Sequence, residues 1–167
     1  MIELKPLKPE FTARALEKAE RYRLLNEPSE SESICRDVLA VDPDNQQALV
    51  WLLLSLTDQI AMGRPAAAEE ARKLLPRLAG EYERAYYGGV IAEREGKARL
   101  RSGAPGSGFA AYDLLACAMR LYEQAQTLAE ADNDDAVLRY NSCVRMIAAH
   151  PELRPEPADD YEPAMLE

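Results

Sequence analysis

The sequence predicts an all-α fold, and three observations lead to this prediction. Ala, Leu, Glu and Arg, which have high helix propensity, dominate the 167 residues, whereas β-branched residues are few. No stretch shows the clean alternation of apolar and polar residues that is typical of a β-strand. Short clusters of proline, glycine and acidic residues divide the chain into segments of helical length.

The first two helices are delimited by proline and serine. Pro9 can open the first helix as its initial residue, and the Asn-Glu-Pro-Ser sequence at residues 26–29 ends it. Ser29 or Ser31 can then cap a second helix, because a serine hydroxyl accepts a hydrogen bond from a free backbone N–H of the first turn. This second helix is predicted to end at residues 41–44, Val-Asp-Pro-Asp.

Five further helices are predicted after this pair. The third ends at Gly63-Arg64-Pro65, and the Gly-rich residues 102–108 separate the fifth from the sixth. The predicted helices cover residues 45–62, 65–79, 81–101, 108–131 and 132–150.

The last part of the chain, residues 150–167, differs in composition from the helical domain at residues 9–149. Residues 151–167 contain four prolines and six acidic residues but one arginine, so they cannot form a continuous helix. Such a segment is normally solvated. It also carries apolar side chains that could occupy a groove of the domain, namely Tyr161, Met165 and Leu166.

The third predicted helix is apolar on almost every side. Its residues 48–56 are too few to span a bilayer, which requires about 20 apolar residues. Burial between neighbouring helices explains the pattern. Trp51 lies within this helix and is either part of the core or an anchor for a ligand.

An internal pattern begins in the first two helices, at residues 12–45. A small residue, Ala19, comes one turn before Tyr22, a second small residue, Ser31, opens the next helix, and Asp42-Pro43 ends the unit. This unit resembles a tetratricopeptide repeat, in which two antiparallel helices cross at small residues. The resemblance extends over residues 12–149. The second unit of this chain departs from the family pattern, because Leu53 stands where the family has a small residue.

The resemblance to small, bacterial-type tetratricopeptide proteins implies a fold and a function. The fold would be a right-handed α–α superhelix of about three helical hairpins plus a terminal helix. The function would be that of an adaptor or scaffold, which binds a partner helix or peptide in its concave groove. A self-associating module, for example a homodimer, and a binding module inhibited by its own tail remain alternatives, as does, with less support, a helical enzyme.

Charge and cysteine content exclude several classes of protein. A net charge of −9 argues against binding to nucleic acid, which requires a basic surface. Three widely spaced cysteines fit neither a disulfide framework nor a zinc site. The charged first residues do not resemble a signal segment, so we expect a cytoplasmic protein that does not enter a membrane.

No motif predicts catalysis, a cofactor or a metal ion. The glycine-rich residues 102–108 lack the following Lys-Ser or Lys-Thr of a phosphate-binding loop. His150 is the single histidine and has no second imidazole or cysteine pair near it in the sequence. We therefore predict that the chain is not an enzyme.

The predicted groove differs from that of the tetratricopeptide proteins that bind chaperone carboxylates. Those proteins present Lys, Asn and Arg where this chain has apolar or acidic residues, so we expect an apolar or basic amphipathic partner. Tyr82 and Tyr86 either extend the groove or fill gaps between helices. The predicted lining is Leu16, Glu20, Val50, Trp51, Leu54, Tyr82, Tyr86 and Gly89.

Overall fold

A computed structural model describes residues 2–157 of the chain, which form helices and connecting turns without a strand. The all-α prediction is thus confirmed for this part of the chain. Two short 3-10 helices accompany the α-helices, η1 (Pro9–Phe11) and η2 (Leu75–Arg77). The α-helices are α1 (Thr12–Leu24), α2 (Pro28–Val41), α3 (Gln46–Ile60), α4 (Ala66–Arg72), α5 (Glu81–Ser102), α6 (Ser107–Leu128) and α7 (Asp135–Ala149).

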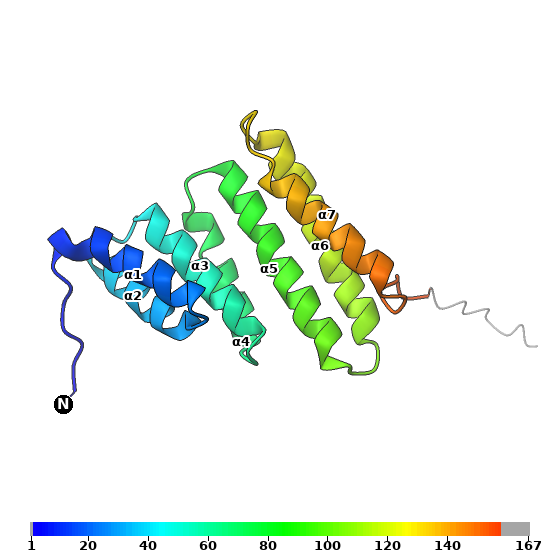
Figure 1. Cartoon of the computed structure of the whole chain (residues 1–167), viewed down its shortest axis with the longest axis horizontal. Coiled ribbons are helices and arrows are strands. Elements are labelled where there is room, and N and C mark those ends of the chain that lie inside the picture. The colour runs from blue at the N-terminus through cyan, green and yellow to red at the C-terminus, as the bar shows by residue number, and fades with distance from the viewer. Residues whose placement is uncertain (1, 158–167) are drawn as a thin grey trace, which may run out of the picture.

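Each α-helix packs against the next one in the chain, and the helices follow one another along the long axis of the molecule (Figure 1). A second set of contacts joins α1 to α3 and α3 to α5. Helix α3 therefore has α1, α2, α4 and α5 as neighbours. This position explains its apolar sequence, because a helix surrounded by other helices buries most of its circumference.

Two predicted helix boundaries are wrong. Pro28 begins α2 instead of ending the previous helix, because proline lacks only an N–H that is unpaired in the first turn anyway. Neither predicted serine caps α2, and Ser31 lies inside it, where its hydroxyl hydrogen-bonds Ser55 of α3 at 2.8 Å. The fourth predicted helix is also shorter than expected, because Pro76 cannot donate to a helical hydrogen bond and falls in η2.

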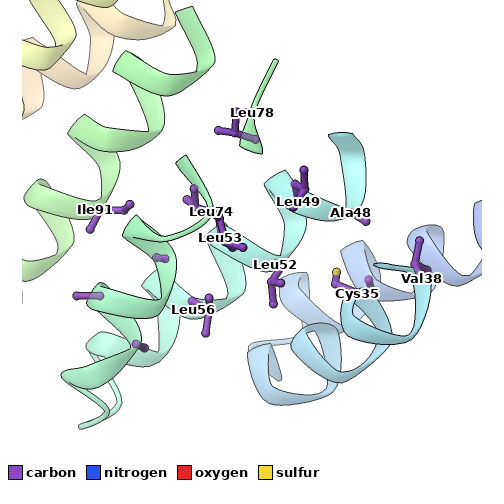
Figure 2. Packing of buried hydrophobic residues seen from close by; sticks show 14 of the residues in the cluster. Cys35, Val38, Ala48, Leu49, Leu52, Leu53, Leu56, Leu74, Leu78 and Ile91 are labelled. Carbon is purple, nitrogen blue, oxygen red and sulfur yellow. The ribbon is translucent and has the colours of Figure 1, made fainter. Parts of the chain in front are cut away.

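The apolar core consists of two clusters. The first contains residues of α1, α2, α3 and α4, together with Ile91 of α5. Figure 2 shows leucines of α3 between Cys35 and Val38 of α2 on one side and Leu74, Leu78 and Ile91 on the other. The second joins α5, α6 and α7. Leu54 of α3 packs against this second cluster, so α3 contacts both.

Beyond α7 the described chain folds back onto α6. Leu153 is buried in the second cluster, and the Arg154 guanidinium lies 5.8 Å from the centre of the Phe109 ring. The first residues of the predicted tail therefore pack on the helices. Tyr161, Met165 and Leu166, which we predicted could occupy a groove, lie outside the described residues.

Candidate functional site

A groove of about 460 Å³ lies between the first half of α3 and the beginning of α5. Helix α3 supplies one wall, and the segment before α5 together with the first turns of α5 supplies the other. Glu83 is the single charged residue of the lining. The lining residues are Gln46, Gln47, Val50, Trp51, Leu54, Leu78, Ala79, Gly80, Glu83 and Tyr87.

The α3 wall contains three of the residues predicted to bind a partner. Val50, Trp51 and Leu54 line the groove, and each is partly exposed. Gln47, Val50 and Leu54 fall three and four residues apart, so they lie along one face of the helix. Their partial exposure separates them from the fully buried leucines on the other faces of α3.

Trp51 occupies an intermediate position between core and surface. It packs against the first apolar cluster, and the guanidinium of Arg23 lies 5.6 Å from the centre of its ring. Arg23 is itself fixed by Asp58 of α3, with 2.6 Å between Nε and Oδ2. The indole Nε1 is buried and has no hydrogen-bond partner among the described residues. One residue of the groove lining is therefore an aromatic ring whose position is stabilised by contact with a cation.

Gln46 holds the opposite edge of the groove in place. Its side-chain oxygen accepts a hydrogen bond from the backbone N–H of Ala79 at 2.8 Å. Its side-chain nitrogen donates to the carbonyl oxygens of Asp44 at 2.9 Å and Arg77 at 3.3 Å. The first turn of α3 is thereby tied to the segment that enters α5.

The α5 wall is formed by Glu83 and Tyr87, which are one helical turn apart. Burial is the main reason that the pKa of Tyr87 is raised to about 12, so its phenol remains neutral at physiological pH. Sequence reasoning missed both residues, because it placed the exposed face of this helix one residue earlier, at Tyr82 and Tyr86. The hydroxyl and the apolar ring of Tyr87 suit an amphipathic ligand.

Tyr82 and Tyr86 lie outside this groove and pack against the second cluster. Their rings are stacked with 5.6 Å between centroids, and Tyr86 is 5.9 Å from the ring of Tyr122 on α6. The Tyr82 hydroxyl donates to Asn133 Oδ1 at 3.3 Å. The structure therefore places them in the contact of α5 with the helices that follow it.

The three other predicted residues are also elsewhere. Leu16 is 3 % exposed and belongs to the first cluster, so it contributes to the core and does not line the groove. Gly89 is buried against the ring of Tyr122. Glu20 is exposed on α1 but does not line the groove.

The most deeply buried carboxylate, Glu93, joins three helices. Tyr122 of α6 donates to it at 2.6 Å, Lys97 of α5 also donates to it, and Arg139 of α7 lies 3.4 Å away. Burial raises the pKa of Glu93, but hydrogen bonds from Lys97 and Tyr122, together with the two positive charges, bring it below its ordinary value. Glu93 therefore remains charged and connects α5, α6 and α7.

The lining of the groove contains one carboxylate, Glu83, and no histidine or cysteine. No group of three or more His, Cys, Asp or Glu in the described residues could hold a metal ion. Burial raises the pKa of Cys35 and Cys143 to about 12 each, so both thiols are protonated. Among the residues with described structure, no helix is both long and apolar enough to cross a membrane.

Comparisons of the chain with protein-family models, with curated proteins and with solved structures give no match.

Proposed function

We propose that the chain is a protein–protein interaction adaptor that binds a partner helix or extended peptide in the groove between α3 and α5. The groove combines partly exposed apolar side chains with one carboxylate, Glu83, and no basic residue. A partner with apolar anchors and a basic flank would complement this lining in both hydrophobicity and charge. The net charge of −9 would also attract such a partner.

The proposed architecture is a right-handed superhelix resembling the tetratricopeptide family, with about three hairpins, α1–α2, α3–α4 and α5–α6, and α7 as the terminal helix. Contacts between consecutive helices, together with those of α1 with α3 and α3 with α5, support this proposal. The Ser31–Ser55 hydrogen bond lies where α2 passes α3, consistent with small residues at close helix crossings. Three free cysteines support a reducing, cytoplasmic location.

Trp51 carries the binding hypothesis, because it is the largest aromatic side chain in the lining of the groove. A displayed peptide library panned against the full chain tests the hypothesis. We expect enriched peptides to combine apolar residues with Lys or Arg. Trp51→Ala should weaken their binding by about 2 kcal/mol, which is roughly thirtyfold in Kd.

Leu24→Ala is the matched control, because Leu24 is 80 % exposed on α1 and does not line the groove. Both variants are first compared with the parent chain by thermal unfolding. If Trp51→Ala and Leu24→Ala bind the enriched peptides as tightly as the parent chain, the groove is not the binding site. Light scattering over a dilution series separates this adaptor from a self-associating module.

A further inference from the structure

A second groove, of about 490 Å³, lies between α6 and α7. Its α6 wall includes Tyr112, Ala116, Met119 and Glu123, which follow one face of the helix over about three turns, or roughly 16 Å. Its α7 wall includes Tyr140, Val144, Ile147 and Ala148. Val144 is 42 % exposed, so the apolar centre of this groove is accessible.

In the proposed repeat, helices α2 and α3 correspond to α6 and α7. The contacts of α4 with this earlier pair indicate what could bind to the later one. Helix α4 packs on α3, and its residues Ala67, Ala68 and Ala71 are buried in the first cluster. Glu70 of α4 also reaches α2, where Arg36 lies 3.0 Å from it. Helix α4 therefore packs on α3, and the Arg36–Glu70 ion pair connects it to α2.

Helices α2 and α6 bury their residues with the same spacing. The residues that share this spacing are Pro28, Ser31, Cys35 and Val38 in α2, and Leu115, Ala118, Tyr122 and Ala125 in α6; α2 also buries Glu32, and α6 also buries Ser107 and Ala111. When these residues of α2 and α6 are matched in order, Glu32 and Arg36 of α2 correspond to Met119 and Glu123 of α6.

The corresponding positions differ in what they contact. Arg36 pairs with Glu70 of α4, and Glu32 accepts a hydrogen bond at 2.7 Å from Arg64, which also pairs with Glu70. Met119 and Glu123, by contrast, line the open groove. In the described residues no helix follows α7 to cover them.

We propose that the α6–α7 groove binds an amphipathic helix from a partner protein, in the position that α4 takes on α2 and α3. The charge at the groove defines the chemistry of this helix. Glu123 occupies the position on α6 that Arg36 occupies on α2. The partner should therefore carry Lys or Arg where α4 carries Glu70. The rest of its buried face should be apolar and small, like the alanines of α4, with an acidic residue beside Arg120 at the rim.

Two stapled helical peptides test this inference on the full chain by fluorescence anisotropy. Both carry the same Ala–Leu stripe, and they differ in having lysines or glutamates along its flank. We expect saturable binding of the lysine peptide. Val144→Glu should weaken it by about tenfold or more, because a carboxylate then lies in the apolar groove. Glu123→Lys should reverse the preference in favour of the glutamate peptide.

Two controls connect the result to this groove. Glu17→Lys makes the same change of charge at an exposed position of α1 and should leave binding unchanged. The lysine peptide also fits the chemistry proposed for the groove between α3 and α5, so the assay is repeated in Trp51→Ala, where the binding that remains should still be weakened by Val144→Glu. Glu123 is exposed, so its variant remains informative if Val144→Glu does not fold.

Four results would overturn the inference. The first is that neither peptide binds saturably, and the second is that binding is the same in Val144→Glu and Glu123→Lys as in the parent chain. The third is lysine-peptide binding that appears only after residues 158–167 are removed, which would make this segment the occupant. The fourth is concentration-dependent self-association that Val144→Glu abolishes, which would make a second copy the occupant.

Discussion

Gly88 and Gly89 are neighbours on α5 but have different surroundings. A Cβ atom at Gly88 would lie 3.5 Å from Leu121 Cδ1, which is an ordinary van der Waals distance. A Cβ atom at Gly89 would lie 2.6 Å from Tyr122 Cε1. The Tyr122 ring is fully buried and its hydroxyl is bonded to Glu93, so the ring cannot easily move.

This contrast predicts opposite effects of the same substitution. Gly89→Ala should lower the free energy of unfolding by about 1–3 kcal/mol, because the methyl group overpacks the contact of α5 with α6. Gly88→Ala should be neutral or raise it by up to about 1 kcal/mol through higher helix propensity. Urea unfolding of the two variants measures both values, and equal effects would contradict the proposed role of Tyr122.

Glu93 predicts a pH dependence of stability. Its pKa is lower in the folded chain than the ordinary value of 4.5, so its ionisation stabilises the fold above that pH. Glu93→Gln should therefore lower the free energy of unfolding at pH 7 by about 2 kcal/mol. The difference from the parent chain should shrink as the pH falls below 4.5 towards the folded-state pKa.

Glu81→Gln is the control for this experiment, because Glu81 is exposed on the same helix. It should change stability by no more than about 0.5 kcal/mol at either pH. If the effect of Glu93→Gln stays constant between neutral and acidic pH, the carboxylate charge is not what stabilises the contact.

At the level of single residues, the sequence predicted part of the groove. Val50, Trp51 and Leu54 follow from the resemblance to tetratricopeptide repeats, which implies that the first helices of successive units line up along a concave surface. Tyr87 and Glu83 could not be predicted, since the side of α5 that is exposed depends on how the helix rotates against α3. Gly89, which was also predicted to line the groove, allows α5 to lie close to the buried ring of Tyr122 instead of a ligand.

Among the helices, α3 depends most clearly on a local signal at its start. The Asn45 side chain accepts a hydrogen bond from the backbone N–H of Ala48 at 2.9 Å and so caps the first turn. Nine residues of α3 are buried, so any fraying at this end exposes the central contacts of the first cluster. The cap also positions Gln46, which holds the edge of the α3–α5 groove.

Loss of this cap should be measurable by itself. We expect Asn45→Ala to lower the free energy of unfolding by about 1 kcal/mol. Asn45→Asp keeps an acceptor oxygen, so it should retain most of the stabilisation that the cap contributes. Thermal unfolding monitored by circular dichroism checks both variants. Equal destabilisation by Ala and Asp would show that the cap contributes little.

The existence of the helices was easier to predict than their ends. Proline explains both wrong boundaries, because the same residue can end one helix or begin the next. At Pro28 the sequence Asn-Glu-Pro-Ser fits either interpretation, and the left-handed conformation of Asn26, with a φ of 63°, identifies the true end of α1. The glycines at 103 and 106 were clearer signals, since both adopt positive φ in the turn between α5 and α6.

In the whole molecule, stability is divided between two apolar clusters that meet at α3 and α5. The first cluster packs helices α1, α2, α3 and α4 together, and the second packs α5, α6 and α7 together. In such an arrangement a local change is felt mainly by neighbouring helices. The order of the helices could be predicted from sequence, but this division could not, because it depends on which helices make contacts across the chain.

Hydrogen exchange can test this division. Val38 is fully buried in the first cluster, and Val38→Ala should speed exchange of amides in α1, α2 and α3 through local opening. Amides in the middle of α6 should keep the protection they have in the parent chain. Uniform loss of protection along the whole chain would show instead that the two clusters unfold as one unit.

The packing of each helix on its successor has a consequence for synthesis of the chain. A helix leaving the ribosome finds its first partner already made, just ahead of it in the nascent polypeptide. Contacts of this short sequence separation close quickly and seldom wait for distant residues. The protein can therefore gain structure progressively during translation, starting with α1 and α2, and limit the time for which its leucine-rich third helix is exposed to other nascent chains.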